Sequence, residues 1–267
     1  MATYLDTLLG TARDRVAAVR DAGEAPGVRA AADALAAQAS PRRLRSALGR
    51  PGVAVIAEVK RASPSKGDLA PGIDAVTQAQ RYLDGGAAAI SVLTEPSRFK
   101  GNLADLNDIT VSTGAIALRK DFVVDELMIH EAVIAGASGV LLIVAALTDD
   151  ELAAMHAEAT RLHLDVLVEV HGEGEVERAL AVGADIIGVN ARNLATFELD
   201  RDAFGRIRAG LPSGVLAVAE SGVRGPEDVH RARDEGADAV LVGEFVITSV
   251  DPTTTVAALV AAGKVDA

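Results

Sequence analysis

Lysine and glutamate residues recur at the ends of apolar, β-branched segments in this sequence. Glu58 and Lys60 end one such segment, Lys120 ends a second, and Glu169 and Glu220 end two more. An ammonium group can protonate a carbonyl oxygen and a carboxylate can accept a proton, so these residue types suit general acid–base catalysis. The pattern predicts an active site if the fold brings the ends of these segments together.

Polar residues share strand faces with apolar ones in five of the segments. Because successive side chains of a strand point to opposite faces, residues of one parity lie together. A charge inside a strand that is buried on both faces costs several kcal/mol unless it is paired. The polar residues come late in each set, which predicts a wet cavity at the carboxyl ends of the strands. The five sets are Ile56, Glu58 and Lys60; Leu118, Lys120 and Phe122; Leu167, Glu169 and His171; Gly188, Asn190 and Arg192; and Val218, Glu220 and Gly222.

Ion pairs that only close the end of a barrel are the alternative interpretation. For a single pair, such as Glu58 and Lys60, that interpretation is as good as a catalytic one. It accounts poorly for five strands that end in this way, because folding does not require two lysines and three glutamates in one pore. We therefore favour an active site.

Eight apolar segments alternate with alanine-rich helical patterns along the chain. Several of the helical patterns end in glycine directly before the next apolar segment, which is typical of a helix-to-strand loop. Continuous apolar segments indicate parallel strands that are covered by helices on one side and packed on the other. The count of eight predicts an α/β fold, a closed (β/α)8 or TIM barrel. The segments are 53–60, 87–94, 115–122, 139–146, 165–170, 186–192, 215–222 and 239–245.

An open doubly wound sheet is the alternative architecture, since it also alternates strands and helices. A GxGxxG turn after the first strand would support it, but residues 58–67 are EVKRASPSKG. The 267 residues fit one barrel of roughly 250 residues. We expect a single domain over 1–267, with an N-terminal helical extension at 1–50 (helices at 1–22 and 28–39) and the barrel at 51–267.

Composition excludes several classes of function. The net charge of -12 and a pI near 4.9 argue against nucleic acid or an anionic membrane surface as the main partner. The absence of cysteine excludes disulfides and thiolate chemistry, and we expect no metal because His171 lacks two further ligands nearby. The first twenty residues carry charges throughout, unlike a signal peptide, and no segment reaches the ~18 apolar residues of a membrane span. We expect a cytoplasmic protein.

Glycines follow the last two strands at the positions where barrels bind phosphate. The seventh strand continues into Ser221-Gly222 and the eighth into Gly243-Glu244. Glycine lets backbone N–H groups approach an anion, and a short helix after the eighth strand would add its positive end. Turn glycines are common in barrels, so the prediction of a phosphate site depends on the two turns together.

Some candidate residues have simpler interpretations. Phe99, in a polar loop, is either an anchor for the loop or a wall for an aromatic ligand, and Lys66 is more simply solvated than catalytic. His130, His156, His163 and His230 occur in helical patterns, where we expect them at the surface. Burial and the proximity of Lys60 are expected to lower the pKa of Lys120, so that removing its charge would leave stability unchanged or improved.

The segment VIAEVKRASPSKG at residues 55–67 resembles the signature segment of the indole-3-glycerol-phosphate synthases. The resemblance continues, in order, through SVLTEPSRFKG, LRKDFVVDELMIHEA, LLIVAAL, LVEVH, GVNARNL, AESGV and LVGE. It covers nearly the whole chain. It implies conversion of 1-(2-carboxyphenylamino)-1-deoxyribulose 5-phosphate to indole-3-glycerol phosphate, CO2 and water in tryptophan biosynthesis, a lyase (carboxy-lyase) reaction that needs no cofactor.

The resemblance also implies roles for the polar residues. Lys120 would be the general acid at the ketone oxygen, and Glu169 the base in the dehydration. Lys60 would contact the anionic groups of the substrate and take part in later proton transfers, while Glu58 would orient the lysines. Asn190 and Glu220 would hold the substrate's hydroxyls and amine. The substrate-binding positions implied are Ser63, Phe99, Phe122, Leu141, Arg192, Ser221, Gly222, Leu241, Gly243 and Glu244, of which Phe99, Phe122 and Leu141 would pack the anthranilate ring.

Phe245 departs from the small residue that the family more often has after Gly-Glu, which puts the shape of the phosphate turn in question. The implied partner is a phosphorylated small molecule, and other enzymes of the tryptophan pathway are candidate partners.

Two other functions compete with this one. A phosphosugar isomerase similar to phosphoribosylanthranilate isomerase would use the same barrel, but would not need two lysines and three glutamates or the 50-residue extension. A catalytically silent scaffold would be marked by loss of a mouth residue, and every expected one is present.

Overall fold

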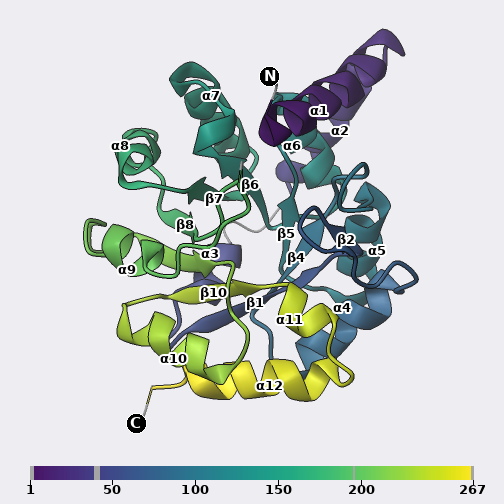
Figure 1. Ribbon diagram of the computed structural model, residues 1–267. Coiled ribbons are helices and arrows are strands. Elements are labelled where there is room, and N and C mark those ends of the chain that lie inside the picture. The colour runs from purple at the N-terminus through teal and green to yellow at the C-terminus, as the bar shows by residue number, and fades with distance from the viewer. Residues whose placement is uncertain (1–2, 39–42, 195, 266–267) are drawn as a thin grey trace.

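Eight parallel strands form a closed barrel in the computed structural model, which describes residues 3–38, 43–194 and 196–265 (Figure 1). The hydrogen-bonded order β1-β10-β9-β8-β7-β6-β5-β4 returns to β1. Each strand lies within one of the eight segments expected from the sequence, so the closed barrel is confirmed and the open sheet is wrong. The strands are β1 (Ala54–Val59), β4 (Ala89–Leu93), β5 (Ala117–Lys120), β6 (Gly139–Ile143), β7 (Asp165–Val170), β8 (Ile186–Asn190), β9 (Leu216–Glu220) and β10 (Ala239–Val242).

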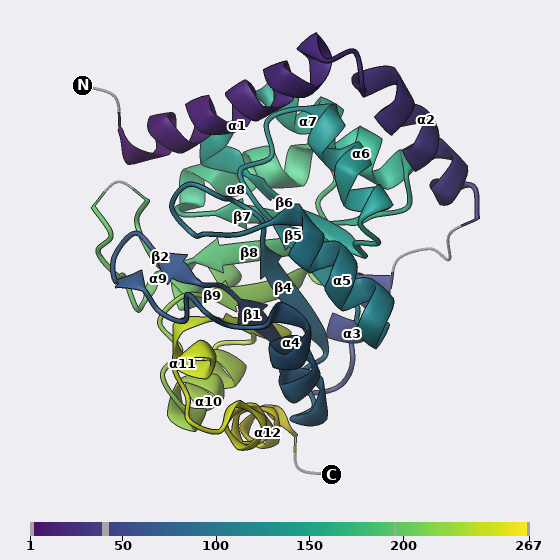
Figure 2. The same cartoon turned by 90° about the vertical axis from the view of Figure 1, so that its right-hand side faces the viewer.

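A ring of helices covers the barrel and buries the outer faces of the strands (Figure 2). Several of these helices begin where a side chain satisfies a free N–H: Asp74, Asn102 and Asp125 each accept from an amide in the first turn. The helices are α4 (Ala75–Asp84), α5 (Leu103–Thr113), α6 (Glu126–Ile134), α7 (Asp149–Arg161), α8 (Glu173–Ala181), α9 (Ala203–Arg208), α10 (Pro226–Asp234) and α12 (Pro252–Gly263).

Short elements at the carboxyl ends of the strands shape the mouth of the barrel. A 3-10 turn, η1 (Val144–Ala146), follows β6, and the short helix α11 (Glu244–Ile247) follows β10 as the sequence predicted. After β1, the strands β2 (Ala62–Ser63) and β3 (Gly67–Asp68) form a small antiparallel hairpin. The sequence did not predict this hairpin, because strands of two residues carry no periodic signal.

The N-terminal segment forms α1 (Tyr4–Asp21), α2 (Ala25–Ala36) and α3 (Arg43–Leu48), and contributes no strand to the described barrel wall. The expected helices at 1–22 and 28–39 correspond to α1 and α2, with the second beginning earlier at Ala25. Figures 1 and 2 show α1 and α2 on the side of the barrel that carries α6. The helix α3 lies at the end of the barrel where the strands begin. It buries Leu44 and Leu48, and the amide of Arg45 donates to Asp165 at the start of β7.

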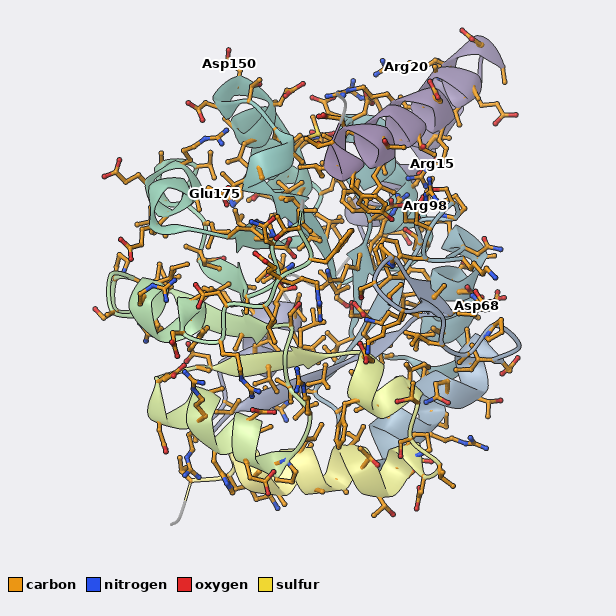
Figure 3. All side chains as sticks on the ribbon, in the orientation of Figure 1. Arg15, Arg20, Asp68, Arg98, Asp150 and Glu175 are labelled. Carbon is orange, nitrogen blue, oxygen red and sulfur yellow. The ribbon has the colours of Figure 1, made fainter. Side chains whose placement is uncertain are left out.

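Two arginines tie α1 to the loop between β5 and α6 (Figure 3). Arg15 donates two hydrogen bonds, of 3.1 and 2.8 Å, to the buried carboxylate of Asp121, the residue directly after Lys120. Arg119 and Thr94 also bond to Asp121, so this carboxylate is held from three sides. Arg20 makes a second bidentate pair with Asp125 nearer the surface. The extension is therefore fixed to the strand that carries Lys120.

His130 corrects one expectation from the sequence. It is buried on α6, with Nε2 2.7 Å from Oε1 of Glu158 on α7, whereas we expected it at the surface. His163 and His230 are exposed and His156 is partly exposed. Among the described residues, no helix combines the length and the apolar character that crossing a membrane would require.

We expect Arg15→Met to lower the free energy of unfolding by about 1–3 kcal/mol, because the buried Asp121 would lose two charge-assisted hydrogen bonds. Denaturant unfolding of the purified variant measures this change. Arg20→Met is the matched control, since Arg20 is more exposed and exposed pairs are worth roughly 0–1 kcal/mol. Equal losses from the two variants would show that the buried pair has no special weight.

Candidate active site

A cavity of about 700 Å³ opens at the carboxyl ends of the strands. All eight barrel strands contribute lining residues, β4 through Leu93, together with the loops that follow the strands and part of α1. The structure brings together every catalytic or substrate-binding residue expected from the sequence, whatever the role of each. These are Glu58, Lys60, Ser63, Phe99, Lys120, Phe122, Leu141, Glu169, Asn190, Arg192, Glu220, Ser221, Gly222, Leu241, Gly243 and Glu244.

Further lining residues come from segments that the sequence analysis did not assign to the site. Tyr4, Leu5 and Leu8 reach the cavity from α1, and Leu194 and Leu199 reach it from the loop after β8. The sequence predicted a helix at 1–22, but a helical pattern does not say whether the apolar face of that helix packs on another helix or lines a cavity. The sequence carried no signal that separates these two uses.

Buried carboxylates surround the two lysines. The side chains of Glu58, Glu169 and Glu220 are almost fully buried, with relative exposures of 3%, 1% and 2%. Lys60 Nζ lies 2.7 Å from Oε1 of Glu58. Lys120 Nζ lies 3.6 Å from Oε2 of Glu169 and 3.7 Å from Oε2 of Glu220. The contacts of Lys120 cross between strands that are far apart in sequence, whereas the pair of Lys60 and Glu58 lies at the end of β1. Both lysines compensate charges that the barrel buries.

Lys120 differs from the expectation in its protonation. Burial by itself would lower the pKa of Lys120, but the attraction of Glu169, Glu220 and Glu58 outweighs burial and raises the pKa above its ordinary value. The expected lowering of the pKa is wrong, and the expectation that removal of the charge leaves stability unchanged or improved loses the like-charge repulsion on which it depended. The reason is geometric, since the charged groups that face Lys120 most closely are carboxylates rather than Lys60.

The pKa values of Glu169 and Glu220 are shifted in opposite directions, although both carboxyl groups are buried. Burial raises the pKa of each carboxyl group, but Lys120 and His171 hold the pKa of Glu169 below its usual value. The pKa of Glu220 is raised well above its usual value by burial and by the charge of Glu169. Neither carboxyl oxygen of Glu220 accepts a hydrogen bond from a described residue, which fits a carboxyl that keeps its own proton. Lys120 therefore lies between two carboxyl groups whose pKa values are shifted in opposite directions, and Glu220 is the one that holds its proton more readily.

Two glycines provide the space for these carboxyl groups. Gly188 lies beside Glu169 in the register of β7 and β8, and a Cβ at Gly188 would overlap a carboxyl oxygen of Glu220. A Cβ at Gly243 would overlap the Glu58 carboxylate and lie 2.6 Å from Lys60 Nζ. Any larger residue at either position would displace a charged partner of the lysines.

The turns after β9 and β10 lie on one side of the cavity. Ser221 and Gly222 both have positive φ, +67° and +86°, and successive residues of this kind can direct N–H groups into a concave surface. The Ser221 hydroxyl donates to Oδ1 of Asn190 at 2.8 Å, which links this turn to β8. Gly243 is the N-cap residue directly before α11, and Phe245 is the second residue of that helix and also lines the cavity. Phe245 therefore does not prevent a helical turn after β10.

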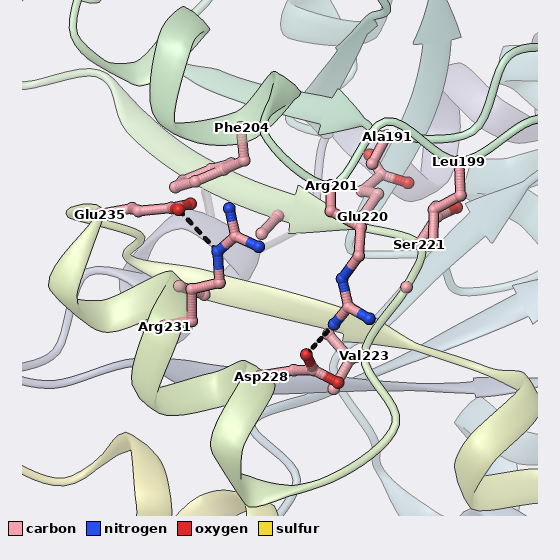
Figure 4. A pocket seen from close by; sticks show the side chains of 13 residues that line it. Ala191, Leu199, Arg201, Phe204, Glu220, Ser221, Val223, Asp228, Arg231 and Glu235 are labelled. Atoms are coloured by element: carbon pink, nitrogen blue, oxygen red, sulfur yellow. Dashed lines mark hydrogen bonds and ion pairs between the residues drawn. The ribbon is translucent and has the colours of Figure 1, made fainter.

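A shallow hollow of about 50 Å³ lies behind the Ser221-Gly222 turn, between α9 and α10 (Figure 4). Its two arginines are already paired: Arg201 with Asp228, and Arg231 with Glu235 at 2.8 Å. Arg201 precedes α9 and Asp228 is on α10, so their pair joins the two segments that flank the turn. This ion pair thus holds together the segments on either side of the Ser221-Gly222 turn, which forms part of the cavity wall.

An aromatic pair forms another wall of the cavity. The rings of Phe99 and Phe122 lie 6.3 Å apart between centroids, tilted by 39°. Glu95 fixes the loop that carries Phe99, because its buried carboxylate accepts hydrogen bonds from the amides of Ser97, Arg98 and Phe99. Phe99 is therefore held at the cavity by backbone bonds rather than by its own packing alone.

Comparison with known proteins gives consistent matches. A family model described as indole-3-glycerol phosphate synthase matches residues 5–259. The chain is 51% identical over 261 residues to the indole-3-glycerol phosphate synthase of Mycobacteroides abscessus, covering 98% of this chain and 95% of that one. It is also 51% identical over 262 residues to the enzyme of that name from Mycobacterium tuberculosis, with the same coverage.

Solved structures with low sequence identity share the fold. A 3-hexulose-6-phosphate synthase from Salmonella typhimurium superposes with a TM-score of 0.65 at 14% identity, over 79% of this chain and 98% of that one. A thiamine phosphate pyrophosphorylase from Pyrococcus furiosus superposes with a TM-score of 0.60 at 17% identity, over 82% and 96%.

We expect Lys120→Met to lower the free energy of unfolding at neutral pH by about 1–3 kcal/mol, because it leaves buried carboxyl groups without their cation. The loss should shrink as the pH falls. The pKa of Glu169 is depressed in the folded protein, so its stabilising contribution is present above the ordinary value of 4.5 and is lost as the pH falls through the folded pKa. Unfolding measured from pH 4 to 8 tests both statements.

Lys100→Met is the control for this prediction, since the pair between Lys100 and Asp68 is about half exposed and should be worth little. A Lys120→Met protein that is as stable as the unaltered one at pH 7 would contradict a net attraction at Lys120.

Proposed function

The chain belongs to the indole-3-glycerol phosphate synthase family, and on that premise we propose which of its residues carry out the reaction. The enzyme is a carboxy-lyase of tryptophan biosynthesis. It closes the indole ring of 1-(2-carboxyphenylamino)-1-deoxyribulose 5-phosphate with loss of CO2 and water. The observation that carries the assignment of roles is the contact of Lys120, in one cavity, with Glu169, whose pKa is lowered, and with Glu220, whose pKa is raised.

Lys120 donates the proton in the ring-closing step. The ring carbon attacks the ketone carbon, a C–C bond forms, and the ketone oxygen takes a proton from the ammonium group. The raised pKa of Lys120 makes it a weak acid in the free protein, so transfer follows the growth of negative charge on that oxygen. The ammonium also stabilises this charge at a site where little water shields it.

Glu169 accepts a proton during the dehydration. When CO2 leaves, the electrons of the broken C–C bond restore the aromatic ring. In the dehydration Glu169 removes the proton from the carbon next to the amine, a C=C bond forms, and the hydroxyl of the first step leaves as water with a proton from Lys60. Glu169 is ionised and in contact with Lys120, so it is a ready base. Lys60, held by Glu58 at 2.7 Å, faces the anionic groups of the substrate and takes part in the later proton transfers. Asn190 and Glu220 hold the hydroxyls and the amine.

The substrate phosphate binds between the turns Ser221-Gly222 and Gly243-Glu244. The supporting observations are the two positive φ angles after β9, the start of α11 at Gly243 and the presence of Ser63 and Arg192 on the same cavity. The net charge is negative, so cations must be concentrated where an anion binds. The anthranilate ring packs against Phe99, Phe122 and Leu141, which line the same cavity.

The substrate is a phosphorylated small molecule. The proposal also includes a single domain over 1–267, a cytoplasmic location and contacts with other enzymes of the tryptophan pathway. The family match argues against an isomerase, and the presence of all the expected mouth residues in one cavity argues against a silent scaffold.

The direct test of function is indole-glycerol phosphate fluorescence, measured with the purified protein alone and the synthetic substrate. Turnover without any added protein or cofactor is expected. Lys120→Ala should reduce kcat by at least ~10²-fold, the typical contribution of a general acid. Lys100→Ala, an exposed lysine outside the cavity lining, should leave kcat unchanged. An active Lys120→Ala enzyme, within a few-fold of the unaltered kcat, would overturn the assignment of the acid.

Phe99→Ala should raise KM roughly tenfold and leave kcat less affected, because an aromatic contact contributes about 1 kcal/mol or more to binding. The loop should keep its shape, since Glu95 bonds to the backbone of residue 99 rather than to its ring. Steady-state kinetics and the thermal midpoint, measured on one preparation, decide the matter. An unchanged KM would make Phe99 a loop anchor only.

A further inference from the structure

Glu169 lies between two potential cations rather than beside one. Its Oε2 faces Lys120 at 3.6 Å, and its Oε1 lies 3.3 Å from Nε2 of His171, two residues further along the same strand face. The reaction assigned above uses Lys120, but it gives His171 no role. His171 is absent from the described lining of the cavity, and the cavity residue that it contacts is Glu169.

A second carboxylate lies behind His171. Oε2 of Glu175 on α8 is 3.7 Å from Nδ1 of His171, and the same oxygen accepts a 2.8 Å hydrogen bond from the His171 amide. That backbone bond fixes the carboxylate beside the ring. Glu175 is partly exposed, in the outer ring of helices (Figure 3), whereas Glu169 is buried. The imidazole therefore bridges a surface carboxylate and a buried one.

The surroundings of the two ring nitrogens of His171 favour the protonated, cationic imidazole. Both ring nitrogens are buried, and neither completes a hydrogen bond of normal geometry with a described residue, although each faces a carboxylate. Only the protonated ring has a donor on each nitrogen, so protonation would supply both carboxylates.

The charged groups that face His171 come from three elements. Burial lowers the pKa of His171, but Glu175 on α8 and Glu169 on β7 outweigh burial and the opposing charge of Lys120 on β5, so the pKa is raised above its ordinary value. Glu169 is faced in addition by Glu220 on β9 and by Asn190 on β8.

We propose that His171, held by Glu175, is a positioning residue that acts through Glu169: the protonated ring keeps this carboxylate ionised and aimed at the cavity, and loss of that proton withdraws the support. His171 and Glu175 thereby couple the pH at the outside of the barrel to the base inside it. The proposal rests on the assignment of Glu169 as the base, but the protonation of His171 is measurable in the free protein.

The first experiment is an NMR titration of the five histidines in the protein without substrate. The His171 resonances are those missing from the His171→Asn variant. Their midpoint should lie above 6.5, the ordinary value for histidine. In Glu175→Gln the midpoint should fall by at least roughly half a pH unit, because the nearby negative charge is removed while an oxygen remains to accept the backbone bond. A midpoint that does not respond to Glu175→Gln would overturn the proposal.

The second experiment is the pH profile of kcat/KM, whose acid limb reports groups of the free enzyme. His171→Asn removes a positive charge close to Glu169, so the limb should move to higher pH by roughly one unit or more. Glu175→Gln should move it in the same direction by less. In the double variant, Glu175→Gln should add no upward shift, because its effect passes through His171.

His163→Asn is the matched control. His163 is exposed with a φ of 62°, a conformation that asparagine adopts readily, so the profile should not change. A purely structural role for His171 predicts a lower thermal midpoint with the acid limb in place, and that result would refute the coupling. An unaltered enzyme with no turnover would instead refute the proposed function, while the NMR titration would still decide the pairing of His171.

Discussion

The attraction between Lys120 and the buried carboxyl groups around it governs the electrostatics of this protein. Three glutamates at the mouth are almost fully buried, and a buried carboxylate costs several kcal/mol unless a cation compensates it. Lys120 supplies that cation to Glu169 and Glu220 at 3.6 and 3.7 Å, while Lys60 supplies it to Glu58. The same short distances also shift the pKa values of Glu169 and Glu220 apart. The pKa of Glu169 is lowered and that of Glu220 is raised, so two carboxyl groups of different acidity face the same lysine in one cavity.

The barrel makes this arrangement possible by placing distant segments side by side. β5, β7 and β9 are not neighbours in the closed order, yet the closure directs their late residues into one pore. Space for the carboxyl groups comes from residues that lack a side chain, since a Cβ at Gly188 or Gly243 would occupy the positions of Glu220 and Glu58. The helical extension completes the cavity with Tyr4, Leu5 and Leu8, and it is fixed by Arg15 to Asp121, the residue next to Lys120. A cation of the cavity, Lys120, and the carboxylate that fixes the extension, Asp121, are therefore adjacent residues at the end of β5.

His171 and Glu175 extend this charge network from the pore to the helix layer. A buried base that is compensated from two sides is less sensitive to the loss of either cation than one that depends on Lys120 alone. The arrangement also means that the pH response of the site need not arise from groups that contact substrate. Charge compensation of this kind is long-ranged in a poorly solvated pore, and it connects residues that share no contact.

The sequence by itself determined the barrel and the membership of the site. Eight apolar segments, glycine-ended helices and a fixed side-chain parity along each strand are local properties, and they predicted the strands and the polar residues at the strand ends. The resemblance to a known family supplied the remaining expected residues, and all sixteen lie on the cavity. Only the tertiary structure decided how those residues are charged. The pKa of Lys120 is raised rather than lowered because its close neighbours are Glu169 and Glu220, which belong to other strands, and not Lys60. The lining residues of α1, the burial of His130 against Glu158 and the contact of His171 with Glu169 and Glu175 were likewise beyond the sequence pattern. Coulombic and packing energies depend on distances across the barrel, and no local pattern along the chain contains those distances.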